Sequence, residues 1–124
     1  MSRVAILGCT GSIGSTAFKV VEGLRRQDGD DAWVVTVLTA GRRVDDLVRL
    51  ARQWRPRLVC VADEAAADRV RGELGEAVRV VPGADGLCSA VTETEVDIVV
   101  NGLVGAIGLP PTLAALRRGL PVAM

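Results

Sequence analysis

A glycine-rich turn follows directly on a short apolar run near the start of the chain. Residues 4–7 are all apolar, as in a central strand that is covered on both faces. The turn from Gly8 to Gly14 has the spacing Gly-x-x-Gly-x-x-Gly, and a segment of helical period comes after it. A tight turn from a buried strand into a helix is typical of α/β folds, where the helix start can bind a phosphate. This feature favours a parallel sheet with helices on its faces.

The rest of the chain alternates short apolar runs with segments of helical period. Strands are predicted over residues 4–7, 33–39, 58–62, 78–81, 96–100 and 120–124. Helices are predicted after the glycine turn and around residues 44–51, 64–74, 84–90 and 111–118, with Asp63 capping the third and Gly119 ending the last. The apolar residues that share one face of the first helix are Ile13, Ala17, Val20, Val21 and Leu24. The pattern predicts an α/β fold, a Rossmann-like doubly wound parallel sheet in a three-layer αβα arrangement.

Length and composition bound the number of domains and the kinds of partner. A chain of 124 residues can bury one core, so residues 1–124 are predicted to form one domain. Lysine plus arginine and aspartate plus glutamate both total 15, which argues against general affinity for nucleic acid or for acidic membranes. Three cysteines at unpatterned spacing and no histidine indicate a reducing compartment and no metal site. The first apolar run is too short for a signal peptide, so a cytoplasmic protein is expected.

The first candidate ligand-binding residues are Thr10, Gly11, Ser12 and Ile13, within the glycine turn. A pyrophosphate needs glycine where a Cβ would collide with it, and backbone N–H groups at the positive end of a helix dipole. Thr10 and Ser12 add hydroxyl donors. The alternative is that the glycines only make a tight strand-to-helix turn. The place of the turn between an apolar strand and an amphipathic helix favours nucleotide binding.

The residues after the second predicted strand indicate which nucleotide would bind. NAD-binding proteins usually carry an acidic residue there, which hydrogen-bonds the adenosine ribose. This chain instead has Gly41, Arg42 and Arg43, and its first carboxylate is Asp45. Two guanidinium groups suit the 2′-phosphate of NADPH, although two arginines can also cap a surface loop. Together with the glycine turn and the missing acid, the pair predicts NADPH as the cofactor.

The small residues after the fifth predicted strand are a third candidate. Gly102 and Val104 follow the carboxyl end of a parallel strand, where ligand crevices form, and are predicted to contact the cofactor. Asn101 can hydrogen-bond the cofactor or close its own turn, and the second role is the more common one for an Asn-Gly pair. The sequence shows no set of residues that would act as general acid, general base or metal ligands, so no catalytic residue is predicted.

Three segments resemble one enzyme family more specifically than the fold requires. Residues 4–15 resemble the opening of the 1-deoxy-D-xylulose 5-phosphate reductoisomerases, whose signature is Ile-Leu-Gly-Ser-Thr-Gly-Ser-Ile-Gly, and residues 97–106 and 109–116 resemble later segments of that family in order and spacing. The resemblance implies an NADPH-binding domain of an enzyme that rearranges 1-deoxy-D-xylulose 5-phosphate and reduces it to 2-C-methyl-D-erythritol 4-phosphate, an isoprenoid precursor. It also implies that the glycine turn holds the pyrophosphate and the Gly41 loop the 2′-phosphate.

The chain departs from the family pattern at three residues and in length. Cys9 stands where serine is usual, Arg43 where asparagine is common, and Gly102 where alanine is common. The family's Asn-Lys-Glu segment, its acidic ligands for Mg²⁺ or Mn²⁺ and its flexible lid are not among these 124 residues. The chain alone is therefore expected to be inactive. The divalent metal, the phosphosugar substrate and a homodimer would belong to the parent enzyme.

Three other interpretations remain open at the level of sequence. Another NADPH-dependent dehydrogenase with a Gly-x-Thr-Gly turn, such as a relative of aspartate-semialdehyde or dihydrodipicolinate reductase, would share the first motif but not residues 101–116. A non-enzymatic nucleotide-sensing module would keep the cofactor site without catalysis. A purely structural α/β domain would bind no nucleotide.

Overall fold

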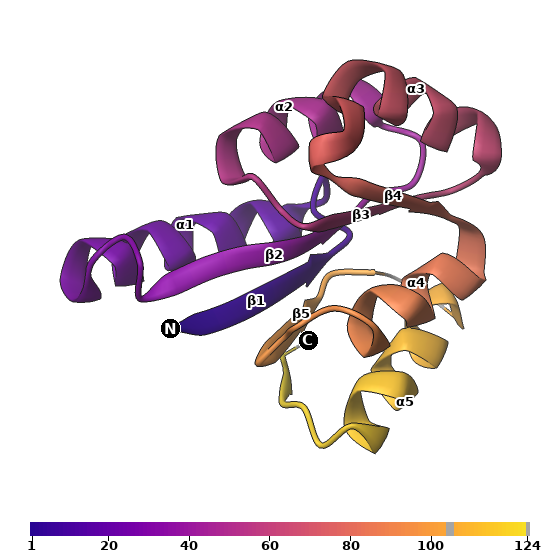
Figure 1. Ribbon diagram of the computed structural model, residues 1–124. Coiled ribbons are helices and arrows are strands. Elements are labelled where there is room, and N and C mark those ends of the chain that lie inside the picture. The colour runs from indigo at the N-terminus through magenta and orange to yellow at the C-terminus, as the bar shows by residue number, and fades with distance from the viewer. Residues whose placement is uncertain (104–105, 124) are drawn as a thin grey trace.

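Six parallel strands form one sheet in the order β4-β3-β2-β1-β5-β6, with the first strand near the middle (Figure 1). The computed structural model describes residues 1–103 and 106–123. Each strand pairs in parallel with its neighbours. The strands are β1 (Ser2–Leu7), β2 (Trp33–Thr39), β3 (Leu58–Val61), β4 (Arg79–Pro82), β5 (Ile98–Asn101) and β6 (Val122–Ala123).

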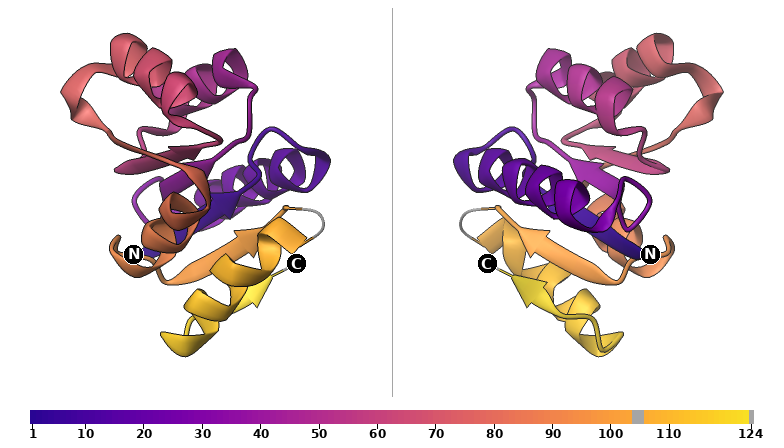
Figure 2. Two further views of the ribbon diagram at one scale, coloured as in Figure 1. Left: turned by 90° about the vertical axis from the view of Figure 1, so that its right-hand side faces the viewer. Right: turned by 90° about the vertical axis from the view of Figure 1, so that its left-hand side faces the viewer.

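Helices cover both faces of this sheet, which gives three layers (Figures 1 and 2). One face carries α1 (Ser12–Asp28), α2 (Val44–Trp54) and α3 (Glu64–Leu74), and the other carries α4 (Gly83–Thr92) and α5 (Leu109–Arg117). Two 3-10 turns, η1 (Gly75–Ala77) and η2 (Ala106–Gly108), join the helices to neighbouring elements. The chain runs outward from β1 to β4, returns along the second face and continues on the other side of β1, since parallel crossovers keep one hand. The predicted doubly wound αβα fold is confirmed.

The central strand β1 contributes to a separate core on each face of the sheet. Val4 and Ile6 belong to the cluster under α1, α2 and α3, whereas Ala5 and Leu7 belong to the cluster under α4 and α5. All four are at most 2% exposed. A strand that is buried on both faces needs apolar residues at every position, which is why the run at residues 4–7 does not alternate with polar residues.

The ends of the elements differ from the predicted ones by one to three residues at several places. The fifth strand begins at Ile98 and not at residue 96, because the Asp97 carboxylate, and not a backbone carbonyl, accepts from the Arg3 N–H at 2.7 Å, while Val96 packs into the core. The last helix begins at Leu109, two residues before the predicted start, since the two prolines in its first turn need no intrahelical N–H bond. The cap at Asp63 is confirmed by a bond of 2.9 Å from the Ala66 N–H.

The predicted apolar face of α1 is only partly buried. Ala17 and Val21 are buried as part of the core, together with Phe18, which was not assigned to that face. Ile13 and Val20 are 44% and 56% exposed. The physical reason is the position of α1 over β1, which leaves the adjacent strands β5 and β6 without a helix on this face among the described residues.

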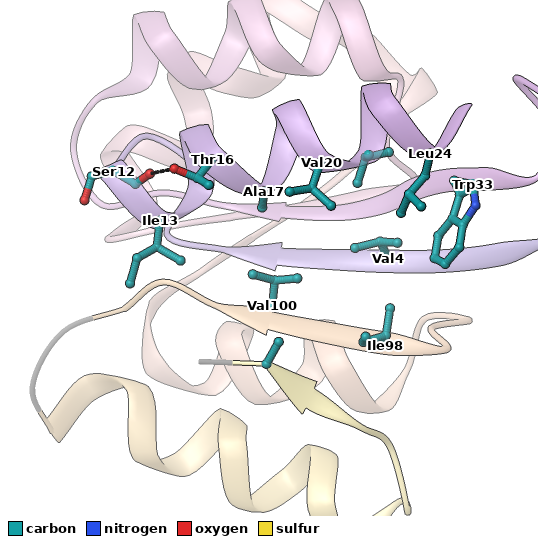
Figure 3. A pocket seen from close by; sticks show the side chains of 12 residues that line it. Val4, Ser12, Ile13, Thr16, Ala17, Val20, Leu24, Trp33, Ile98 and Val100 are labelled. Atoms are coloured by element: carbon teal, nitrogen blue, oxygen red, sulfur yellow. Dashed lines mark hydrogen bonds between the residues drawn. The ribbon is translucent and has the colours of Figure 1, made fainter. Parts of the chain in front are cut away.

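An apolar groove of about 520 Å³ lies where α1 stands beside this open part of the sheet (Figure 3). Its walls come from α1, β1, β5 and the ends of β2 and β6, and Figure 3 shows Ile13, Val20 and Leu24 on the helix side and Ile98 and Val100 on the strand side. The groove is lined by Val4, Ser12, Ile13, Thr16, Ala17, Val20, Val21, Leu24, Trp33, Ile98, Val100 and Ala123.

The two kinds of apolar position on α1 should differ in their contribution to stability. Phe18 is 7% exposed and its ring packs on Trp54 with centroids 5.1 Å apart, so we expect Phe18→Ala to lower the free energy of unfolding by about 3–5 kcal/mol. Val20→Ala, at the open groove, should change it by less than about 0.5 kcal/mol. Urea unfolding of both variants checks this, and equal losses would show that the groove side is as well packed as the core side.

Candidate functional site

The loops after β1, β2 and β5 meet at one edge of the sheet. These strands are neighbours, and the strand order reverses between the half that contains β2 and the half that contains β5. In open α/β sheets, ligands bind in the crevice beyond the carboxyl ends of the strands at such a reversal. The three sets of residues predicted from the sequence therefore belong to loops at one end of the fold.

The glycine turn is fixed to the end of β2 by hydrogen bonds. The Gly8 N–H donates to the Thr39 hydroxyl at 2.9 Å, and the Cys9 N–H donates to the Thr39 carbonyl at 2.8 Å. Thr39 is completely buried, and Gly8 has a φ of +70°, which favours glycine. Thr39 was not identified from the sequence, where its only signal is a polar residue at the end of an apolar strand. The glycine turn thus has a defined position relative to the loop after β2.

The glycines of the turn have different structural roles. A Cβ on Gly14 would lie 2.7 Å from backbone atoms of both Cys9 and Gly8, a distance that does not occur in real contacts. A Cβ on Gly8 would lie 3.1 Å from the Gly102 backbone. Among the described residues, a Cβ on Gly11 would contact the Gly8 carbonyl oxygen alone, at an ordinary 3.5 Å. The tight packing of the turn explains why residues 8 and 14 are glycines. The contacts of the described residues do not explain why residue 11 is a glycine.

The positive end of the α1 helix dipole has neither a side-chain cap nor an acidic residue in the first turn of the helix. Gly11 is the N-cap residue, and glycine has no side chain to accept a bond from the first turn. The first turn carries no acidic residue, and Gly11, Ser12 and Ile13 are exposed. Figure 3 shows Ser12 and Ile13 on the first turn of this helix. Backbone N–H groups in such a position suit a phosphate.

The loop after β2 brings Arg43 next to the glycine turn. Gly41, Arg42 and Arg43 are all exposed. Arg43 lies next to the turn, with its Nη1 3.5 Å from the Thr10 carbonyl oxygen and its Nη2 3.0 Å from a carboxylate oxygen of Asp46. Within residues 1–103 and 106–123, the Arg42 side chain makes no ion pair or hydrogen bond. The Arg43 guanidinium is therefore held by Thr10 and Asp46, and the Arg42 guanidinium has no such contact among the described residues and can bind an anion.

The loop after β5 also contacts the glycine turn. The Gly102 N–H donates to the Leu7 carbonyl at 2.8 Å, and a Cβ on Gly102 would lie 2.9 Å from that carbonyl oxygen and 3.3 Å from the Cβ of Ile13. Gly102 therefore lies directly beside the turn. Val104 lies outside the described residues, so its predicted contact stays a prediction.

The side chain of Asn101 is fully used within the protein. Its Nδ2 donates to the Gly108 carbonyl at 3.0 Å and to the Thr112 hydroxyl at 2.6 Å, and its Oδ1 accepts from the Leu103 N–H at 3.0 Å. Asn101 is 3% exposed. The turn-closing role considered for Asn101 is thus the observed one. Thr112, which sequence reasoning missed, completes this buried network and ties the β5 loop to α5.

The side chain of Cys9, within the glycine turn, is buried in the protein. It is 1% exposed, and burial raises the pKa of its thiol to about 12. A thiol with such a raised pKa stays protonated and is a poor nucleophile. Cys9 therefore serves as a packing residue in this environment.

Residues 1–103 and 106–123 hold no group of three or more His, Cys, Asp or Glu side chains that could bind a metal ion. No helix among the same residues combines the length and the apolar character that crossing a bilayer requires.

The doubly wound parallel sheet and the glycine turn at its reversal point define the chain as a Rossmann-like α/β domain. Residues 4–124 match the family model described as 1-deoxy-D-xylulose 5-phosphate reductoisomerase, and the chain belongs to this family. This confirms the resemblance seen in the sequence.

Individual 1-deoxy-D-xylulose 5-phosphate reductoisomerases are similar to this chain over almost its whole length. The chain is 42% identical to the 1-deoxy-D-xylulose 5-phosphate reductoisomerase of Trichlorobacter lovleyi over 100% of the chain and 31% of that protein. It is 43% identical to the Aeromonas salmonicida enzyme over 96% of the chain and 30% of that protein. The chain thus spans about a third of the length of these relatives.

Solved structures agree with the sequence comparison. The Zymomonas mobilis reductoisomerase in complex with NADPH is similar with a TM-score of 0.86 and 32% identity, over 98% of the chain and 31% of the solved one. A DOX-P reductoisomerase in complex with NADPH, fosmidomycin and magnesium is similar with a TM-score of 0.83 and 31% identity, over 98% of the chain and 29% of the solved one.

A methyl group on Gly14 should destabilise the fold, whereas one on Gly11 should not. Gly14→Ala forces backbone atoms of two neighbours apart, so we expect a loss of about 1–3 kcal/mol in the free energy of unfolding. Gly11→Ala only replaces glycine at an N-cap and should cost less than about 1 kcal/mol. Urea denaturation measures both, and a Gly11→Ala loss as large as that of Gly14→Ala would contradict the assigned roles.

Proposed function

We propose that the chain is the NADPH-binding domain of a 1-deoxy-D-xylulose 5-phosphate reductoisomerase and holds NADPH at the edge where the loops after β1, β2 and β5 meet. The observation that carries the proposal is the glycine at position 11, which lies at the start of α1 and against which no described residue packs closely enough to exclude a side chain. The reductoisomerase from Zymomonas mobilis, which is similar to this chain, was solved in complex with NADPH. That complex supports the same cofactor for this chain.

In this proposal the residues Thr10, Gly11, Ser12 and Ile13 hold the pyrophosphate. Backbone N–H groups of the first helical turn donate to the phosphate oxygens, and the hydroxyls of Thr10 and Ser12 add donors. The space beside Gly11 lets the pyrophosphate approach the backbone, because no Cβ fills it. Gly102, which packs against Ile13, lies on the side toward β5, and Gly102 and Val104 are predicted to contact the rest of the cofactor.

The loop of Gly41, Arg42 and Arg43 holds the 2′-phosphate of NADPH. The exposed side chain of Arg42 offers an unshared guanidinium, and Arg43 approaches the phosphate turn from the same loop. Charge-assisted bonds from arginine to phosphate contribute about 1.5–3 kcal/mol each before screening by solvent. NADH has no 2′-phosphate, so these bonds favour NADPH.

The complete enzyme would rearrange 1-deoxy-D-xylulose 5-phosphate and reduce the product to 2-C-methyl-D-erythritol 4-phosphate. When bound, NADPH supplies the hydride for the reduction. The residues of this chain bind and orient the cofactor, and the phosphosugar site, the Mg²⁺ or Mn²⁺ ligands and any homodimer contact belong to the part of the relatives outside the matched third. We therefore expect no turnover by residues 1–124 alone. The proposal also includes the cytoplasmic location expected from the sequence.

A valine at position 11 tests the cofactor site directly. Gly11→Val places a branched side chain where the pyrophosphate would lie, in a region with an ordinary backbone conformation and no close protein contact, so the domain should fold and lose NADPH binding. Calorimetric titration with NADPH, together with circular dichroism, measures both properties. Undiminished NADPH binding by the variant would place the cofactor elsewhere, and no binding by the parent chain would refute the proposed function.

The arginine loop should determine the choice between NADPH and NADH. We expect Arg42→Ala combined with Arg43→Ala to weaken NADPH binding by roughly 2–5 kcal/mol, with NADH binding almost unchanged. Raising the salt concentration should weaken NADPH binding to the parent more than to the double variant, because the parent has more charge to screen. Titration of both proteins with both nucleotides checks this. Equal losses for the two nucleotides would mean that the arginines support the loop and do not contact the phosphate.

A further inference from the structure

The two arginines of the β2 loop differ in what surrounds them. Arg43 is the N-cap residue of α2, and its guanidinium bridges the Asp46 carboxylate on the same helix and the Thr10 carbonyl of the phosphate turn, at 3.0 and 3.5 Å. Arg42 has no such side-chain contact among the described residues. One of the two candidate phosphate ligands is thus already oriented across the space between α1 and α2.

A polar groove of about 430 Å³ lies under this bridge, between α1 and α2. Thr10, Ser15 and Lys19 line it from the α1 side, and Arg43, Asp46 and Arg49 line it from the α2 side. The anchored guanidinium therefore lies at the place where the phosphate turn and the arginine loop come together. An anion bound to both loops would meet it there.

The charge of Asp46 is shared between two guanidinium groups. Its Oδ2 is 3.0 Å from Arg43 and its Oδ1 is 3.9 Å from Arg49. A carboxylate between two cations repels a nearby phosphate less than an unpaired one does. The Asp46 carboxylate orients the Arg43 side chain, because a long side chain that is 69% exposed otherwise samples many rotamers. The remaining N–H groups of Arg43 stay available, because a guanidinium has five donors.

We propose that Asp46 is a positioning residue that holds the Arg43 guanidinium toward the phosphate turn and thereby increases the preference of the site for a 2′-phosphorylated nucleotide. This inference rests on the proposed function, because it assumes that the 2′-phosphate binds at the loop of Arg42 and Arg43. Arg43 then contacts the phosphate, and Asp46 acts only through Arg43. The neighbouring acid, Asp45, makes a different contact, an ion pair of 3.2 Å with Arg69 on α3.

The test compares Asp46→Asn with Asp45→Asn in the 124-residue chain. Both variants remove one negative charge from the first turn of α2, and Asp45 serves as the matched control because its side chain pairs with α3. We expect Asp46→Asn to weaken NADPH binding by about three- to tenfold, since Arg43 must then be ordered by the ligand, and to leave NADH binding within about twofold. Asp45→Asn should not weaken the binding of either nucleotide. The midpoint temperature of thermal unfolding should be similar for the two variants, because both ion pairs are exposed and contribute little to stability.

The same substitution in an Arg43→Ala background separates positioning from a general charge effect. There, Asp46→Asn should not weaken NADPH binding further, because the side chain that it orients is gone. Equal or tighter NADPH binding by Asp46→Asn in the parent background would overturn the proposal, as would an equal loss for NADH or the same loss from Asp45→Asn. No NADPH binding by the parent chain would refute the proposed function itself, and the role of Asp46 with it.

Discussion

The close approach of three backbone segments at the end of β1 is the constraint on which the rest of the site depends. The turn after β1, the start of α1 and the loop after β5 approach so closely that side chains at Gly8, Gly14 or Gly102 would contact backbone atoms at 3.1 Å or less. Hydrogen bonds from the turn to Thr39 and from Gly102 to Leu7 hold the segments in place. Because backbone and not side chains fills this region, the first N–H groups of α1 are exposed at the edge of the sheet.

This packing separates the glycines that the turn itself requires from Gly11, which we assign to the cofactor in our proposal. A glycine triplet by itself is compatible with a tight turn and with a phosphate site, and in this motif packing within the protein accounts for Gly8 and Gly14. Gly8 and Gly14 have contacts within the protein that exclude a side chain, whereas Gly11 has room for one. The family membership and the NADPH complexes of relatives then support a nucleotide in that room.

The sheet is covered unevenly, and this has a consequence for the first helix. α1 lies over β1 and β2 and borders an open apolar groove above β5 and β6 (Figure 3). The apolar residues of α1 therefore lie in two environments: Phe18 and Val21 pack in the core, and Val20 borders the open groove. Periodicity identifies the apolar side of a helix, but it does not tell how much of that side has a partner.

The sequence by itself determined the fold class, the strand-helix alternation and the three loops of the candidate site, because strand burial, helical period and glycine spacing are local patterns. It did not determine which residues of those loops are anchored. Thr39 and Thr112 bind groups that are 31 and 11 residues away in the chain, and Arg43 contacts Thr10 across 33 residues. Such contacts depend on how β1, β2 and β5 are placed side by side, and only the tertiary structure decides that placement. The same holds for Gly11, whose free space is set by neighbours that the spacing of the motif does not reveal.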